Sequence, residues 1–140
     1  TFSLALLEIT QQQQEMQTLR RQADRWRTVV DAAGVGTWDW HIPSGQVSHS
    51  PGFGDLLEFR GDHHALTLDL WRDRVHPEDW PLVLASIQNH LLGKSAAVVL
   101  SYRISKSAGG WQRVTLRGAV TEREADASAV RMLGTLVAAD

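Results

Sequence analysis

The N-terminal stretch from Phe2 to Ala33 contains neither glycine nor proline, and this constrains the fold more than any other feature. The stretch is rich in Gln, Leu, Arg and Glu, which favour or tolerate the helical conformation. Gly34 and Gly36 follow, and glycine readily adopts the left-handed conformation that closes a helix. The pattern therefore predicts one long helix over residues 1–33, with a second domain beginning at residue 34.

Apolar residues in this predicted helix recur with a heptad period, and Gln12 is a candidate polar layer that fixes the register. The pattern favours a parallel coiled-coil homodimer. The alternative is a single amphipathic helix packed on its own domain. The residues expected at the dimer contact are Ile9, Met16, Leu19, Ala23, Trp26 and Val30.

After Gly36 the sequence changes to short segments. Residues 37–42 and 46–50 flank the turn sequence Pro43-Ser44-Gly45 and predict a hairpin. Residues 51–64 predict short helices and loops. A helix is expected from Pro77 to about Leu92, with the proline at its first position and Gly93 at its end.

The last part of the chain alternates apolar and polar residues with period two, as half-buried strands do. Three strands are predicted, over 98–105, 111–122 and 130–138. Five strands with short helices inserted after the second predict an α+β domain over residues 34–140, with the helices on one face of an antiparallel sheet.

Composition excludes several classes of function. The absence of cysteine removes disulfides, thiolate catalysis and Cys-type metal sites, and it fits a cytoplasmic protein. The 14 basic and 16 acidic residues indicate neither a nucleic-acid nor an anionic-membrane partner. The apolar start is far shorter than the roughly 20 residues that cross a bilayer, although a membrane helix or another domain before residue 1 is left open.

Four pieces of sequence together resemble one known family, the PAS domains, from about Val29 to Asp140. They are Gly36-Thr37-Trp38-Asp39-Trp40, the segment from Trp71 to His76-Pro77-Glu78-Asp79, Gly109-Gly110-Trp111 with Arg113-Val114, and Leu133-Gly134-Thr135. The resemblance implies a five-stranded antiparallel sheet in the order 2-1-5-4-3, with a helix packed across it and a cavity between them. It also implies a regulatory role as a dimer, with an effector such as a histidine kinase or a cyclic-di-GMP enzyme linked after Asp140.

The implied cavity is a candidate site for a small-molecule ligand, since such sites are concave and mostly apolar. A plain packed core in a ligand-free dimerisation module is the alternative. The resemblance is to the subclass of PAS domains whose first strand carries Trp-Asp-Trp, as residues 38–40 do here. His49 is of interest because that subclass often has an aromatic residue there, although an exposed strand histidine is as good an interpretation. The candidate lining residues are Trp40, His49, Ile87, Leu100, Tyr102 and Leu116.

No cofactor is identified by the sequence. Flavin-cysteinyl chemistry is excluded because the chain has no thiol, while non-covalent flavin or haem in a redox or gas sensor stays open. His90, inside the expected helix, is the candidate haem ligand, but a histidine near a helix end also favours the helix dipole. Asp62, His63 and His64 lack the spacing of a metal site. No catalytic motif occurs, so the sequence predicts a non-enzymatic sensor.

Overall fold

The computed structural model describes residues 2–58 and 66–139, and the chain divides into two compact units, Thr1–Ala33 and Gly34–Asp140. The elements are α1 (Phe2–Ala32), β1 (Gly36–His41), β2 (Gln46–His49), α2 (Pro51–Leu56), α3 (Leu68–Arg74), α4 (Trp80–Leu91), β3 (Val98–Ser105), β4 (Trp111–Arg123) and β5 (Ala129–Ala138).

The first unit is α1, a helix of 31 residues. Its end follows the prediction, because Gly34 takes a positive φ of 72° after the last helical turn. The apolar side chains along α1 are exposed, and Trp26 is 70% accessible to solvent. Taken by itself, α1 therefore presents an apolar stripe that is open to solvent.

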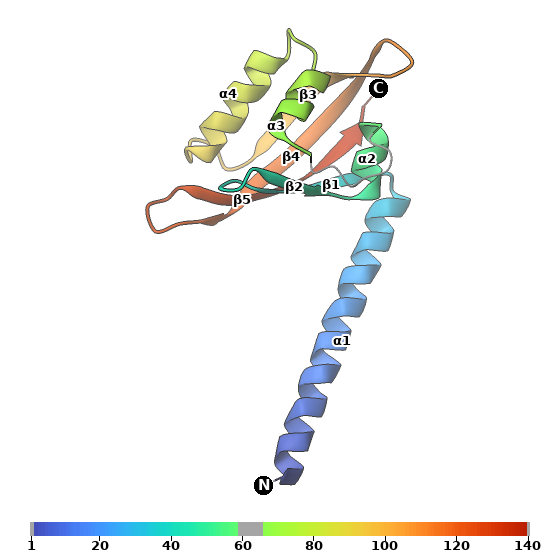
Figure 1. Cartoon of the computed structure of the whole chain (residues 1–140), viewed down its shortest axis with the longest axis vertical. Coiled ribbons are helices and arrows are strands. Elements are labelled where there is room, and N and C mark those ends of the chain that lie inside the picture. The colour runs from blue at the N-terminus through green and yellow to red at the C-terminus, as the bar shows by residue number, and fades with distance from the viewer. Residues whose placement is uncertain (1, 59–65, 140) are drawn as a thin grey trace. The chain divides into compact units, whose positions relative to one another are not determined.

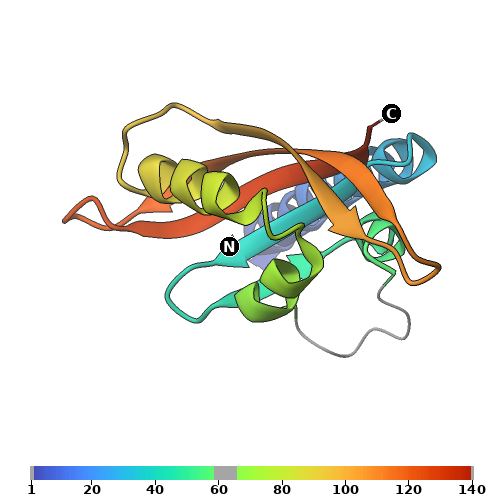
Figure 2. The same ribbon diagram turned by 90° about the horizontal axis from the view of Figure 1, so that it is seen from above.

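The second unit contains one antiparallel sheet in the order β2-β1-β5-β4-β3, which is the predicted order. Figures 1 and 2 show α2, α3 and α4 on the same face of this sheet. The register places β1 between β2 and β5, with Trp40 opposite Val47 on one side and Met132 on the other. The central strand is β5, which joins the N-terminal hairpin to the long β3–β4 hairpin.

The core lies between the sheet and the three helices. Period-two alternation turns every second strand residue inward, so that in β3 the residues Val98, Leu100, Tyr102 and Ile104 are buried. The helices add Phe53, Trp71, Val83 and Ile87 from the opposite side. Burial of these side chains from both layers is the main source of stability for the domain.

The fourth helix begins later than predicted. Pro77 lies in a turn rather than at the first helical position, and α4 starts at Trp80 with Pro81 in its first turn. The turn is closed by the backbone N–H of Asp79, which donates to the carbonyl of His76 at 2.9 Å. The imidazole Nδ1 of His76 accepts from the N–H of Glu78 at 3.0 Å. These contacts hold residues 76–79 as a turn, which delays the helix.

The acids of this turn bind β3 rather than the start of the helix. The carboxylate of Asp79 accepts three hydrogen bonds from Arg103, one from its backbone N–H and two from its guanidinium, at 2.8 to 2.9 Å. Hydrogen bonding to Arg103 lowers the pKa of Asp79 to about 2, against the desolvation that raises it. This contact fastens the start of α4 to the sheet.

Candidate sensory cavity

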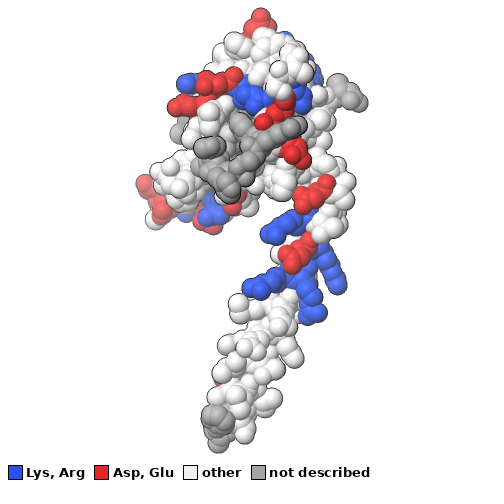
Figure 3. All heavy atoms as spheres, turned by 45° about the vertical axis from the view of Figure 1, so that its right-hand side comes forward, with Lys and Arg blue, Asp and Glu red and all other residues white. Residues whose placement is uncertain are grey.

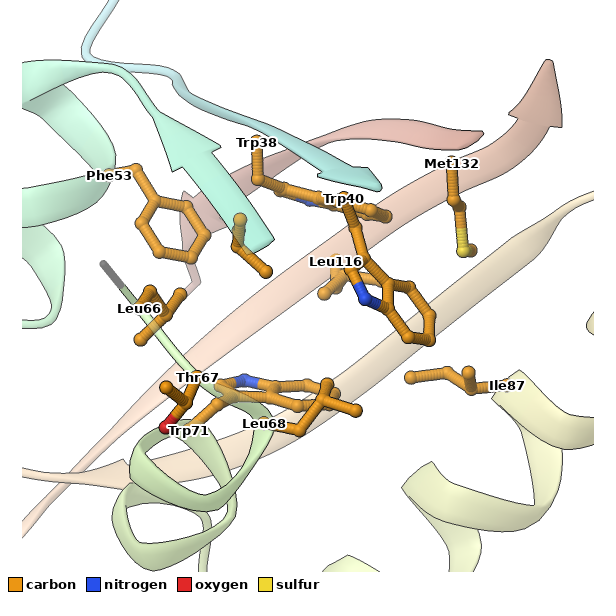
Figure 4. Close-up of a pocket in the computed structure, with 11 residues that line it drawn as sticks. Trp38, Trp40, Phe53, Leu66, Thr67, Leu68, Trp71, Ile87, Leu116 and Met132 are labelled. Atoms are coloured by element: carbon orange, nitrogen blue, oxygen red, sulfur yellow. The ribbon is translucent and has the colours of Figure 1, made fainter. Parts of the chain in front are cut away.

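A small cavity of about 50 Å³ lies between β1 and the helices (Figure 4). Its walls come from every layer of the domain, with β1, β2, β4 and β5 on one side and α2, α3, α4 and the residues before α3 on the other. The lining residues are Trp38, Trp40, Val47, Phe53, Leu66, Thr67, Leu68, Trp71, Ile87, Leu116 and Met132. The lining is almost wholly apolar.

Trp38 lines the cavity from the side of the sheet. Its ring can lie close to the neighbouring strands because the two residues next to it there are glycines. Gly118 in β4 and Gly134 in β5 are paired in the register, and Trp38 pairs with Gly134. A Cβ atom on Gly134 would stand 2.3 Å from the Trp38 ring, and one on Gly118 would stand 2.6 Å from it. The Trp38 Nε1–H donates to the carbonyl of Thr135 at 3.2 Å, which fixes the ring on the strands.

The helical wall is organised around Trp71 of α3. Its Nε1–H donates to the hydroxyl of Tyr102 at 3.2 Å, and the two rings meet edge to face with centroids 6.0 Å apart. Burial raises the pKa of the Tyr102 phenol, and the hydrogen bond from Trp71 offsets this in part. Thr67 caps α3, since its hydroxyl oxygen accepts from the N–H of Leu70 at 3.2 Å.

The predicted ligand-binding residues fall into two groups. Trp40, Ile87 and Leu116 line the cavity. Leu100 and Tyr102 are buried in the core beside the cavity but do not line it. In the case of Tyr102, the ring of Trp71 lies against the phenol ring. His49 is half-buried, where its ring stacks on Phe53 with centroids 5.2 Å apart and its Nδ1 lies 3.2 Å from the carbonyl of Ser50.

His90, the candidate haem ligand, is 3% exposed and uses both ring nitrogens within the protein. Its Nδ1 lies 2.9 Å from the carbonyl of Ser95, and its Nε2 accepts from the backbone N–H of Val120 at 2.9 Å. An acceptor at Nε2 requires the proton on Nδ1, so the imidazole is neutral in this arrangement. Binding iron would break one of these hydrogen bonds.

Several lining residues were missed by the sequence analysis, above all those of α3. That helix was not predicted, although Thr67 before Leu68 and Asp69 in the first turn carry the signal of a helix start. Phe53, Leu66 and Met132 were missed because period and composition do not indicate which buried residues face a cavity.

In residues 2–58 and 66–139 there is no cluster of three potential metal ligands. The predicted surface loop at Asp62, His63 and His64 lies outside the described residues.

None of the described helices is long and apolar enough to cross a membrane.

The arrangement of sheet, helices and cavity defines a class of small sensory domain. The family described as the PAS fold matches residues 46–136 of the chain. The match covers more than half of the sequence, and the chain therefore belongs to the PAS fold family. PAS domains are sensory modules of signalling proteins.

Solved structures support the same fold. A sensory box histidine kinase/response regulator from Burkholderia thailandensis is 24% identical, with a TM-score of 0.69, and the match covers 81% of this chain and 83% of that one. A light and redox sensing histidine kinase domain from Haloarcula marismortui is 16% identical, with a TM-score of 0.66 and coverage of 84% and 99%. The N-terminal domain of a diguanylate cyclase from Marinobacter aquaeolei is 17% identical, with a TM-score of 0.63 and coverage of 74% and 94%. No match was found among curated proteins.

Proposed function

We propose that this PAS domain relays a signal to an effector, a histidine kinase or a cyclic-di-GMP enzyme linked after Asp140, through a parallel dimer formed by α1. Two of the similar structures belong to histidine kinases and one to a diguanylate cyclase, which supports this choice of effector. The chain would act within a cell, as the cytoplasmic part of a signalling protein.

The exposed apolar stripe of α1 is the observation that carries the proposal. In the heptad frame that starts with Phe2 at an a position, Ile9 and Met16 are a residues, and Leu19 and Trp26 are d residues. These four side chains are between 51% and 70% accessible. A long helix that leaves such side chains in water gains stability by burying them against a partner. A second copy of α1 offers a matching stripe, and Ala23 and Val30 continue the seam.

Charges beside the seam favour the parallel orientation. In the heptad frame Glu15 occupies a g position and Arg20 the following e position, so each Glu15 would face the Arg20 of the partner helix in a parallel dimer. On the face drawn in Figure 3, Lys and Arg and Asp and Glu side chains gather toward the C-terminal end of α1. Arg21, Asp24 and Arg25 fall at f, b and c positions, where they stay in water around the seam.

The signal would pass as a change between two packings of the paired helices. A ligand in the cavity drives this change to the extent that it binds one packing more tightly than the other, because equal affinity shifts no equilibrium.

A matched pair of leucine substitutions tests the dimer. Leu19 lies on the seam and Leu7 at an f position away from it, and they are 66% and 63% exposed. Sedimentation equilibrium of the 140-residue chain should show a dimer for the wild type and for Leu7→Asp, and a monomer for Leu19→Asp. A monomeric wild type, or equal effects of the two substitutions, would rule out the coiled coil.

Cysteine cross-linking tests the orientation, since the chain has no cysteine of its own. A parallel, in-register dimer brings the two copies of residue 23 together at an a position. Ala23→Cys should therefore form a disulfide-linked dimer under mild oxidation, whereas Thr28→Cys at an f position should not. Equal cross-linking at both positions would exclude the predicted register.

A further inference from the structure

The indole N–H of Trp40 has no hydrogen-bond partner in the part of the chain that the structure describes, although the side chain lines the cavity and is 8% exposed. The two other lining tryptophans are satisfied, Trp38 by the carbonyl of Thr135 and Trp71 by the hydroxyl of Tyr102. Buried N–H groups without a partner are rare in folded proteins. Figure 4 shows the Nε1 edge of Trp40 turned toward the space that the labelled side chains enclose.

One other described atom shares this property, but it does not indicate a ligand. Arg131 Nε also has no hydrogen-bond partner there, yet it lies 3.6 Å from a carboxylate oxygen of Glu122 and the same guanidinium is paired with Asp39. Its charge is therefore balanced within the protein. Trp40 differs because a neutral donor faces an apolar cavity in which no described residue supplies an acceptor.

The lining defines the chemistry of that molecule. Among the described residues it contains no Asp, Glu, Lys, Arg or His, and an ion without a partner is expensive to bury. The one hydroxyl among the described lining residues, on Thr67, accepts the capping bond from Leu70, and Figure 4 shows its oxygen on the side away from Trp40. A water molecule needs two to four polar partners to be held well, and among the described lining residues only the N–H of Trp40 is turned toward the space. An apolar molecule with a single acceptor matches the lining better.

The volume of the cavity also limits the size of the ligand. Its volume of about 50 Å³ exceeds the space needed for one water, but it is well below the roughly 150 Å³ of an engineered cavity that binds benzene. A ligand of a few non-hydrogen atoms fits this volume without a rearrangement of the core.

We propose that the cavity binds a small uncharged molecule, mostly apolar, whose one ketone, aldehyde, ester or ether oxygen accepts a hydrogen bond from Trp40 Nε1–H. This inference deepens the proposed sensory function by assigning the chemical class of the signal. Trp40 acts as the specificity-determining residue, and Trp38, Ile87 and Leu116 supply the apolar contact.

Three probes of nearly equal shape separate the acceptor from the apolar contact. They are 2-butanone, its alkene isostere 2-methyl-1-butene, and the charged sec-butylammonium ion. In ¹H–¹⁵N spectra of the 140-residue chain, 2-butanone should bind in the millimolar range and move the Trp40 indole N–H resonance downfield. The alkene should bind about tenfold more weakly without that downfield shift, and the ammonium ion should not bind.

Two tryptophan substitutions provide the matched comparison. Trp40→Phe removes the unpaired donor and should reduce the ratio of ketone to alkene affinity to about one. Trp38→Phe makes the same chemical change at a lining residue whose N–H is already bonded, and it should leave the ratio unchanged. If Trp40→Phe fails to fold, the wild-type affinities and the Trp40 resonance still decide the question.

The proposal is overturned if ketone and alkene bind the wild type equally, if the Trp40 resonance stays in place, or if none of the probes binds. A water molecule in the cavity that 2-butanone does not displace would make all the probes fail to bind. These outcomes leave the dimer untouched, because the oligomeric state is measured with Leu19→Asp. A monomeric chain that binds the ketone would instead refute the relay and retain the ligand class.

Discussion

His90 Nε2 accepts a hydrogen bond from the backbone N–H of Val120 at 2.9 Å, and this contact joins the end of α4 to β4. β4 runs to Arg123, beyond its last pair with β3 at Gly118, so Val120 has no strand partner on that side. The imidazole therefore accepts the hydrogen bond that a neighbouring strand would otherwise accept from Val120. Arg123 completes the junction by donating to the carbonyls of Leu91 and His90 at 2.9 and 3.2 Å.

The first prediction concerns this junction. His90→Phe keeps a ring of similar shape but leaves the Val120 N–H unpaired, so the free energy of unfolding should fall by about 1 to 3 kcal/mol. Urea denaturation followed by tryptophan fluorescence measures the change. His41→Phe, at the last residue of β1, where the imidazole makes only an exposed contact with Ser44, should cost about 0.5 kcal/mol or less. Equal losses for the two variants would contradict the role assigned to His90.

The second prediction concerns the ring of Trp38 over the glycines. A methyl group on Gly118 would meet the end of that ring at 2.6 Å, so Gly118→Ala should lower stability by about 1 to 3 kcal/mol. Trp38→Leu removes the ring and leaves only a tight contact of 3.1 Å with the Leu133 carbonyl, so the alanine should then cost less, with a coupling of about 1 kcal/mol or more in the double-mutant cycle. Additive effects would show that the ring does not set the cost.

Gly134→Ala serves as a comparison within the same cycle. Its added methyl would also lie 2.0 Å from the carbonyl oxygen of Arg117, which is backbone and cannot turn away. Trp38→Leu should therefore rescue Gly134→Ala less than Gly118→Ala.

The third prediction is that the free energy of unfolding depends on pH through the carboxyl group of Asp79. Its pKa is lowered to about 2 in the folded state, against about 3.9 in an unfolded chain. A carboxyl with a lowered folded-state pKa stabilises the protein above the unfolded value and loses that effect as pH falls through the folded value. Asp79→Asn should cost about 1 to 2 kcal/mol at pH 7, a value reduced for partial exposure of the pair.

Urea denaturation of wild type and Asp79→Asn at pH 7, 4 and 3 measures this effect. The difference between them should begin to shrink near pH 4 and should be lost as the pH falls through 2. Glu78→Gln is the control, because Glu78 is exposed and reaches Arg103 at 3.5 Å, and it should change stability by about 0.5 kcal/mol or less. A difference that is constant with pH would exclude the ion pair as its source.

The fourth prediction uses Tyr102, the single tyrosine of the chain. Burial raises the pKa of its phenol above the ordinary value of about 10, so the folded protein should show no phenolate absorbance at 295 nm as pH passes 10. An acid with a raised folded-state pKa stabilises the fold below its unfolded value, and this contribution is lost as pH rises above 10. Phenolate should thus appear together with alkaline unfolding, and a titration near 10 with intact structure would contradict the burial.

The role of Tyr102 also illustrates where prediction from sequence ended. Period two placed Trp40 and Tyr102 on the same inner face, and both are buried as expected. Trp40 faces the cavity and Tyr102 does not, because Trp71 of α3 covers the phenol. That difference depends on where a helix lies over the sheet, and the local sequence around either residue does not encode it.

The sequence by itself determined the long N-terminal helix, the five strands and the α+β class of the domain. Heptad spacing with no glycine or proline predicted α1, a turn sequence predicted the first hairpin, and alternation of apolar residues predicted the last three strands, because these signals are local. The tertiary structure alone decided what Trp40, His90 and Asp79 do. Their partners, or the lack of one, come from packing between segments far apart in the chain, and no periodicity records which distant atoms a side chain will meet.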